Sequence, residues 1–167
     1  MSWTFNNQAV TDDIIPENSI GFIYIITAPD GKRYLGRKLL KSTKTKTTKG
    51  VKKKIKVDSD WKDYWSSSPF LQTMIEELGK DNFKREIIYF AFTKGMLVYS
   101  EEKALYALGA LESDDWLNGN IRAKVYRTWV DKNTSHLLNE AIKRQSSDSS
   151  SKASSSSSKD AEQKGQN

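Results

Sequence analysis

Few kinds of side chain in this 167-residue chain could do chemistry, because it has no cysteine and a single histidine, His136. A disulfide scaffold, a cysteine-ligated zinc site, a cysteine nucleophile and a histidine-rich metal site are therefore excluded. Tyrosine, lysine or arginine, and glutamate remain as the candidate types. His136 lies outside the region where these residues gather, and we expect it to be an ordinary exposed residue.

Two tyrosines stand out by their spacing. Tyr24 and Tyr34 lie ten residues apart, on either side of Pro29-Asp30-Gly31, which is a strong turn signal. If the flanking segments are the two strands of a hairpin, the pair can lie side by side across the ladder. The alternative is that both tyrosines only pack on the sheet.

The positive charge is concentrated in one segment. The chain carries 27 Lys and Arg against 21 Asp and Glu, a net charge of +6, yet 12 of these bases and no acid lie between Lys32 and Lys56. Three aromatic residues follow within residues 61–65. Such a segment is typical of phosphate contacts combined with base stacking, and the alternative is a solvated charged face. The residues predicted to bind DNA are Arg37, Lys38, Lys41, Lys44, Lys46, Lys49, Lys52, Lys53, Lys54, Trp61 and Lys62.

The order of the predicted elements indicates a small α+β domain. Residues 20–27 and 32–36 predict a hairpin, residues 41–57 a long basic loop, and residues 83–92 a strand. Ser68-Pro69 predicts the start of a helix that ends at Gly79. Its expected apolar face consists of Phe70, Leu71, Met74, Ile75 and Leu78.

A second helix is predicted to begin at the capping residue Ser100, with an apolar stripe of Ala104, Leu105, Leu108 and Leu111. Glu101 and Glu102 then occupy its first turn, where their charge favours the positive end of the helix dipole. Glu101 precedes Leu105 by one turn, which would aim its carboxylate toward the sheet, whereas Glu102 would point toward solvent. Glu101 is the first candidate for a functional carboxylate, and Glu102 is the second.

Composition divides the chain into four parts. Residues 1–17 are an N-terminal extension, residues 18–130 the folded domain, and residues 131–145 a short helix carrying Leu137, Leu138, Ala141 and Ile142. Residues 146–167 are predicted to be a disordered tail, because ten of the thirteen residues from Ser146 to Ser158 are serine. No apolar run approaches the roughly 20 residues of a membrane span. The N-terminus lacks a secretory signal, so an intracellular protein is expected.

The hairpin motifs are similar to those of a known family. Gly21-Phe22-Ile23-Tyr24 and, beyond the turn, Tyr34-Leu35-Gly36 resemble the hairpin of GIY-YIG nucleases. Segments 60–68 and 78–87 look like phage-encoded, homing-endonuclease-like members. The resemblance covers residues 20–120. It implies a three-stranded antiparallel sheet flanked by helices, with a helix after the second motif, a third strand at residues 83–92 and a late helix at residues 100–111.

The resemblance also implies a DNA endonuclease that depends on Mg²⁺ (or Mn²⁺). Glu101, with Glu102 as second choice, would bind the single metal ion. Tyr24 would take the proton of the attacking water, and Tyr34 would place water or phosphate. Because free tyrosine titrates at about pH 10, this role needs nearby cations to stabilise the phenolate, and residues 32–56 are expected to supply them.

Three further positions bear on this resemblance. Asn118 stands where the family often has an aromatic-x-Asn turn, and the alternative is a plain turn residue. Counting eight residues past Gly36, to the place of the family's phosphate-binding arginine, leads to Lys44, a point charge that cannot bind bidentately. Arg37 is the other candidate, because it directly follows the motif. Residues 41–49 are rich in threonine, so a helix there would be short or broken.

The sequence thus predicts a metal-dependent DNA endonuclease, homing-like or nicking. If it is phage-encoded, it acts in the cytoplasm of the infected host. The first alternative is a non-catalytic nucleic-acid-binding module that retains the GIY-YIG fold, which the lysine at position 44 favours. The second is an interaction protein that acts through its serine-rich tail.

Overall fold

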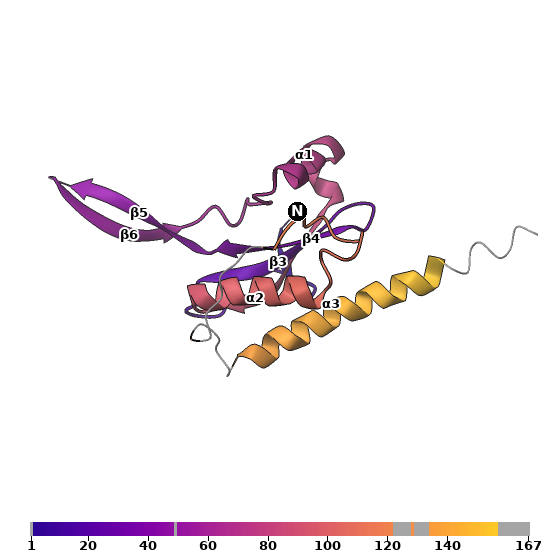
Figure 1. Ribbon diagram of the computed structural model, residues 1–167. Coiled ribbons are helices and arrows are strands. Elements are labelled where there is room, and N and C mark those ends of the chain that lie inside the picture. Colours follow the sequence, from indigo (N-terminus) through magenta and orange to yellow (C-terminus); the bar gives the residue numbers. More distant parts are fainter. Residues whose placement is uncertain (1, 49, 122–127, 129–133, 157–167) are drawn as a thin grey trace, which may run out of the picture.

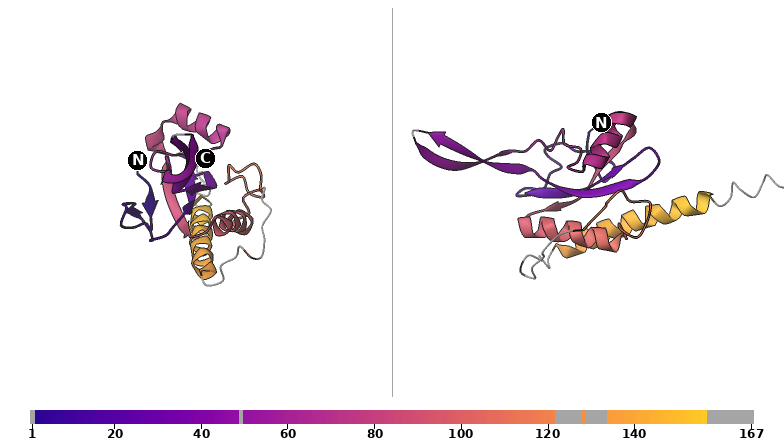
Figure 2. Two further views of the ribbon diagram at one scale, coloured as in Figure 1. Left: turned by 90° about the vertical axis from the view of Figure 1, so that its left-hand side faces the viewer. Right: turned by 45° about the horizontal axis from the view of Figure 1, so that its top comes forward.

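The computed structural model describes residues 2–48, 50–121, 128 and 134–156. A central sheet has helices on both faces (Figures 1 and 2). Helix α1 (Pro69–Leu78) covers one face, and α2 (Lys94–Ala107) covers the other together with α3 (Ser135–Ser156). The predicted α+β class is confirmed.

The sheet is larger than the three antiparallel strands predicted. Those three are present as β3 (Gly21–Thr27), β4 (Arg33–Leu39) and β7 (Lys84–Ala91), but the full order is β2-β1-β7-β3-β4. The short strands β1 (Thr4–Phe5) and β2 (Gln8–Ala9) come from the expected N-terminal extension, and β1 runs parallel to β7. Trp3 is only 2% exposed and its Nε1 donates to the carbonyl of Trp61, which explains why this end joins the core.

Strand β3 lies at the middle of the fold. Every residue from Gly21 to Ile26 is buried, because helices cover both faces of the sheet, and its sequence is accordingly a continuous apolar run. Side chains at 23 and 25 point toward α2 and α3, and those at 22, 24 and 26 toward α1. The turn to β4 includes Gly31 at a φ of 88°, which confirms the predicted hairpin.

The basic segment is not a loop but a second antiparallel hairpin. Strands β5 (Lys41–Thr48) and β6 (Val51–Asp58) pair along their whole length as a separate two-stranded sheet, with Gly50 in the turn at a φ of 79°. It projects away from the body of the molecule (Figure 1). Its lysines alternate with threonine, valine and isoleucine, whose β-branched side chains favour strands. The helix expected directly after the second motif is therefore displaced to α1.

Helix α1 begins and ends as predicted. The Ser68 hydroxyl accepts from the backbone N–H of Leu71, and Gly79 follows the last turn at a φ of 82°. Leu71 and Ile75 are buried, but Phe70 and Leu78, which were assigned to the same apolar face, are exposed. A one-turn 3₁₀ helix, η1 (Lys80–Asn82), then leads into β7.

Helix α2 begins two turns earlier than predicted. Its cap is Thr93, whose side chain accepts from the N–H of Met96, and Ser100 is a buried residue of the helix interior. The helix ends at Ala107, so Leu111 lies beyond it and is exposed, while Ala104 and Leu105 are buried as expected. The two glutamates after Ser100 thus lie in the middle of the helix, and attraction to a helix N-terminus does not explain them.

The C-terminal patch packs as a helix. Leu138, Ala141 and Ile142 of α3 are buried against the same core as α2, whereas Leu137 and His136 are exposed. The helix continues to Ser156, past Ser146, where disorder was predicted; residues 157–167 lie outside the described residues. None of the described helices is long and apolar enough to cross a membrane.

Glycine at position 36 is required by the ring of Tyr24, which lies opposite it on β3. A Cβ on Gly36 would come within 2.5 Å of the Tyr24 hydroxyl oxygen and 2.6 Å of its Cζ. The last glycine of the Tyr34-Leu35-Gly36 motif therefore makes room for the tyrosine of the other motif.

We predict that Gly36→Ala lowers the free energy of unfolding by about 1–3 kcal/mol, as overpacking of a core does. Urea denaturation measures this. Gly119→Ala is the matched control, since a Cβ there meets nothing within 4 Å. Equal stability of the two variants would contradict the packing argument.

Candidate active site

The two tyrosines lie side by side on one face of the sheet. Tyr24 is opposite Gly36 and Tyr34 is opposite Ile26, so the rings are diagonal neighbours with centroids 6.4 Å apart. Tyr24 is 1% exposed, whereas Tyr34 is half-buried. The spacing argument from sequence is confirmed, and only Tyr34 retains an accessible surface.

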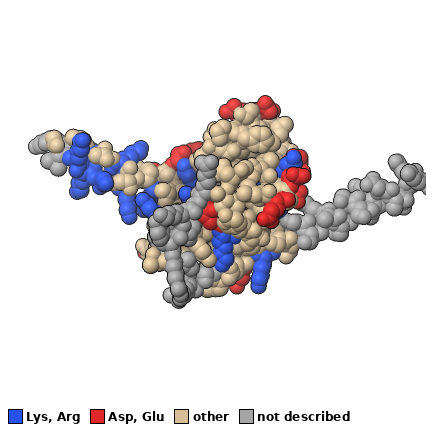
Figure 3. Space-filling view, viewed as in Figure 1, with Lys and Arg blue, Asp and Glu red and all other residues tan. Residues whose placement is uncertain are grey.

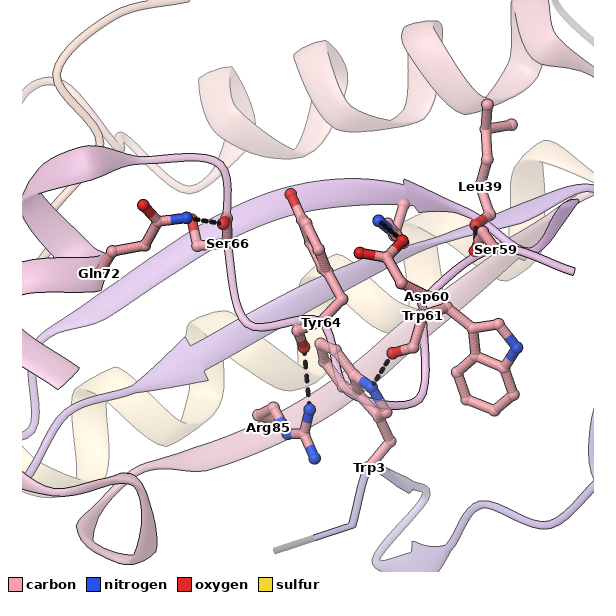
Figure 4. A network of polar contacts seen from close by, with 10 residues as sticks. Trp3, Leu39, Ser59, Asp60, Trp61, Tyr64, Ser66, Gln72 and Arg85 are labelled. Atoms are coloured by element: carbon pink, nitrogen blue, oxygen red, sulfur yellow. Dashed lines mark hydrogen bonds and ion pairs between the residues drawn. The ribbon is translucent and has the colours of Figure 1, made fainter. Parts of the chain in front are cut away.

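A third tyrosine completes this cluster. The ring of Tyr64 lies 6.0 Å from that of Tyr24 in an edge-on arrangement, and the buried Ser66 hydroxyl contacts both Tyr24 and Tyr34. Ser66 is fixed by Gln72, which donates to its carbonyl (Figure 4). Sequence reasoning gave Tyr64 and Ser66 no role in the tyrosine site. The available signal was their place in segment 60–68, which carries part of the family resemblance.

Arg85 anchors the segment that carries Tyr64. Its Nη1 donates to the carbonyl of Tyr64 at 2.9 Å (Figure 4) and to that of Lys62 at 3.2 Å. Its guanidinium lies over the rings of Trp3 and Trp65. Burial lowers the pKa of Arg85 from its usual value. This buried arginine therefore positions the third tyrosine from the neighbouring strand β7.

On the other face of the sheet, Arg37 of β4 forms an ion pair with Glu101 of α2. Arg37 Nη1 lies 2.6 Å from Glu101 Oε2, and the two side chains are 37% and 18% exposed. Glu102, which was expected to point toward solvent, is buried. Helix α2 lies flat against the sheet over this region, so both glutamates face partly or wholly inward.

The surroundings of Glu101 and Glu102 raise the pKa of both carboxyls. Burial raises the pKa of Glu101, the neighbouring charge of Glu102 raises it further, and Arg37 opposes both effects. Burial also raises the pKa of Glu102, again against Arg37. The carboxylate form of Glu101 is thus lost, as pH falls, at a higher pH than for an ordinary glutamate. A bound cation would stabilise that form.

Tyr34 connects the two faces. Burial raises its pKa, contact with the Ser66 hydroxyl lowers it, and the charge of Glu101 raises it again. The effect of Glu101 places the Tyr34 hydroxyl in the field of the carboxylate, even though the two residues start from opposite faces. Strand β4 ends the strand order of the sheet, and residues 115–118 are hydrogen-bonded along its outer edge at Arg33 and Leu35, on either side of Tyr34.

The lysines do not stabilise a Tyr24 phenolate, contrary to the expectation from sequence. The pKa of Tyr24 is raised well above 10, first because the ring is buried and then through Tyr64 and Tyr34. Most of the basic segment extends outward along β5 and β6. The nearby Lys38 lies 3.6 Å from the centroid of the Tyr64 ring and binds Asp60 at 2.5 Å.

Asn118 is bound to the backbone of β4. Its Oδ1 accepts from Leu35 N at 3.0 Å, and its Nδ2 donates to Leu35 O at 2.8 Å. The chain beside it pairs with the same strand, because Arg33 N donates to Asp115 O and Leu117 N donates to Arg33 O. Asn118 therefore fixes the strand between Tyr34 and Gly36.

A groove at the base of the β5–β6 hairpin is lined by residues of both the central sheet and the hairpin. This basal groove has a volume of about 520 Å³ and is lined by Arg37, Lys38, Leu39, Ser42, Lys44, Asp58, Ser59, Asp60 and Leu97. Both candidates for the phosphate-binding cation, Arg37 and Lys44, therefore line one cavity. Arg37 comes from the central sheet and Lys44 from the projecting hairpin.

The other predicted DNA-binding residues are dispersed. Lys41, Lys46, Lys52, Lys53 and Lys54 are exposed along the hairpin, and Lys49 lies outside the described residues. Trp61 is 7% exposed and packs edge-on against Phe22, so no free indole face is offered for stacking. Lys62 is exposed and pairs with Asp12 at 3.1 Å.

A hairpin that carries the two tyrosine motifs and pairs with a third strand, in a sheet with helices on both faces, is the arrangement of a GIY-YIG domain. The chain belongs to the GIY-YIG family: residues 3–121 match the family model described as "Putative endonuclease segE, GIY-YIG domain". That match includes the N-terminal strands, both hairpins and α2. No curated protein and no solved structure matched the chain.

The residues present fit a single hard cation better than a many-ligand cage. Within the described ranges, no three His, Cys, Asp or Glu side chains are grouped to hold a metal ion. Glu101 and Glu102 are close enough to raise a pKa, with Arg37 as their shared counter-charge. Mg²⁺ commonly takes one or two carboxylates and keeps several waters, which this donor set allows.

We predict that Asn118→Ala lowers the free energy of unfolding by about 1–3 kcal/mol, because it leaves the N–H and C=O of Leu35 without their side-chain partner. Chemical denaturation measures this effect. Asn120→Ala, at an exposed position two residues on, is the control and should be close to neutral. A variant at 118 as stable as the parent chain would show that the two bonds do not hold the strand.

Proposed function

We propose that this protein is a metal-dependent endonuclease that hydrolyses phosphodiester bonds in DNA, homing-like or nicking in action and phage-encoded. The observation that carries the proposal is the Arg37–Glu101 pair, 2.6 Å apart, in which Arg37 lines the basal groove and lies on the strand that also carries Tyr34. Phosphodiester hydrolysis needs a cation for the phosphate, a carboxylate for a metal ion and a polar group for water. Strand β4 carries two of these groups, Arg37 and Tyr34, and Glu101 pairs with Arg37 from α2.

In this proposal Glu101 holds Mg²⁺ or Mn²⁺, and Glu102 is the second choice. Glu101 is preferred because its side chain is partly exposed, whereas Glu102 is buried. When bound, the ion would neutralise charge on the phosphate and lower the pKa of a water molecule bound to it. The raised pKa of Glu101 is consistent with such a site, since burying two adjacent carboxylates is costly without an additional positive charge.

Arg37 is the proposed phosphate-binding group. Its planar guanidinium can bind two phosphate oxygens at once, which a lysine cannot do. Arg37 is about one-third exposed toward the basal groove, so a phosphate entering there can reach it. Lys44, on the opposite wall of this groove, is assigned a supporting contact to a neighbouring phosphate.

The tyrosines are assigned to water and proton positioning. Tyr34 is half-buried near Glu101, and its hydroxyl is the one placed to orient water or phosphate. Tyr24 remains a neutral phenol because of its burial, and we assign it to the hydrogen-bonding chain through Ser66 and Tyr34 rather than to a preformed phenolate. Asn118 supports both by fixing the strand that carries Tyr34.

A second candidate is a non-catalytic nucleic-acid-binding module that retains the GIY-YIG fold. The observation that favours it is the deep burial of Tyr24, which opposes loss of its proton. The two candidates differ only in turnover, because both bind nucleic acid through the same basic surface.

We predict metal-dependent nicking of supercoiled plasmid that EDTA stops. Glu101→Gln should lower the rate at least 100-fold, because it removes the proposed ligand of the ion. Glu102→Gln should have a smaller effect. Tyr34→Phe and Tyr24→Phe should also reduce cleavage while DNA binding, measured in EDTA, persists.

Glu112→Gln is the matched control, since Glu112 is an exposed carboxylate outside the site, and it should cleave like the parent chain. Binding without cleavage by the parent chain, at any Mg²⁺ or Mn²⁺ concentration, would favour the non-catalytic module. Full activity in Glu101→Gln would refute the assigned metal ligand.

A further inference from the structure

The two faces of the β5–β6 hairpin differ in their position relative to the candidate active site. Because side chains alternate along paired strands, one face carries Ser42, Lys44, Lys46, Lys53, Ile55 and Val57, and we call it the groove-side face. The opposite face carries Lys41, Thr43, Thr45, Thr47, Lys52, Lys54, Lys56 and Asp58. Ser42 and Lys44 of the groove-side face line the basal groove together with Arg37, whereas the acidic Asp58 is the one residue of the opposite face that does so.

The groove-side face carries charge that the hairpin does not need for its own stability. Lys46 lies directly opposite Lys53, and like charges at paired positions destabilise an antiparallel ladder. Lys44 lies two residues before Lys46 in β5 and on the same face, so it adds a third ammonium group to that face. No acidic residue lies between residues 32 and 57 to compensate for them. Figure 3 shows lysine and arginine side chains gathered along the projecting hairpin.

We propose that the hairpin is a β-ribbon arm that lies in the major groove of duplex DNA, with its groove-side face toward the bases. This inference rests on the proposed function, because it takes DNA as the substrate. The arm would hold the duplex immediately beside the phosphate at Arg37. Lys44, Lys46 and Lys53 would bind phosphates and guanine edges.

The dimensions and chemistry of the arm suit this groove. The major groove of B-form DNA is about 12 Å wide and admits a two-stranded ribbon. Eight residues per strand give an arm of about 26 Å, somewhat less than one turn of the duplex. Lysine binds guanine O6 and N7, and the half-buried Ile55 and Val57 offer apolar contacts of the kind that thymine methyl groups accept.

Other nucleic acids fit the arm less well. Single strands are usually held by stacking on aromatic side chains, but residues 41–58 contain none and the adjacent Trp61 is buried. Double-stranded RNA has a deep and narrow major groove that side chains do not read. Duplex DNA is therefore the ligand to which the proposal commits.

Binding of the full chain to a 30-base-pair mixed-sequence duplex, measured by fluorescence anisotropy in EDTA across a salt series, tests the proposal. Lys44→Gln, Lys46→Gln and Lys53→Gln together should weaken binding at least tenfold. The salt slope should fall by about 3, one unit for each lost phosphate contact. The triple variant Lys52→Gln, Lys54→Gln and Lys56→Gln, matched in charge on the opposite face, should lose less than threefold.

Groove choice is read by competition. Methyl green, which occupies the major groove, should displace the protein, and netropsin, which occupies the minor groove, should not. Equal losses from the two triple variants, displacement by netropsin alone, or equal binding of double-stranded RNA would each overturn the proposal. Circular dichroism checks that both variants fold; removing the Lys46–Lys53 repulsion should not harm the hairpin.

Because the binding assay contains EDTA, no metal-dependent cleavage occurs in it, and the affinity that it measures does not depend on whether the protein is an active nuclease. If the parent chain nicks plasmid but both triple variants bind equally, the arm is wrong and the nuclease stands. If the groove-side variant alone loses affinity and the parent chain never nicks, the arm stands and the catalytic assignment fails.

Discussion

The structure depends on the register of β3 against β4, in which Tyr24 stands opposite Gly36. Only a residue without a side chain leaves room for the tyrosine ring at that point. The same register places Tyr34 on the tyrosine face and Arg37 on the face of α2. A slip of one residue would exchange the two faces and bury the guanidinium among aromatic rings.

The candidate site is built on β4, the strand at the end of the sheet order. Arg37 ties β4 to α2 through Glu101, and Asn118 ties the same strand to the chain that follows α2. Tyr34 directly precedes Leu35, to which Asn118 is bound, and the charge of Glu101 raises its pKa after the larger effect of burial. Strand β4 thus carries Tyr34 and Arg37, which are proposed to act on phosphate. Residues 41–57 of the projecting hairpin carry eight lysines and no acidic residue.

Local signals in the sequence were sufficient for part of this arrangement. The turn at Gly31 and the cap at Ser68 depend on a few adjacent residues, and both were predicted correctly. The start predicted for α2 is wrong because Ser100 followed by two glutamates resembles a helix N-terminus. The actual cap, Thr93, has no acidic residue in the turn that follows it. The position of Tyr64 could not be predicted, since it is set by Arg85 on a distant strand. The segment of the β5–β6 hairpin indicates a loop in the sequence because its many lysines, which are depleted in strands, obscure the strand preference of its threonine, valine and isoleucine residues.

The claim that a divalent cation binds at Glu101, beside Tyr34 and Arg37, is tested most directly by Mn²⁺-induced paramagnetic broadening in the NMR spectrum of the labelled full chain. The account predicts that resonances of Tyr34, Arg37, Glu101 and Glu102 broaden first, that residues 50–53 at the far end of the hairpin do not, and that Glu101→Gln abolishes the effect. Broadening centred elsewhere, or unchanged in Glu101→Gln, would contradict it.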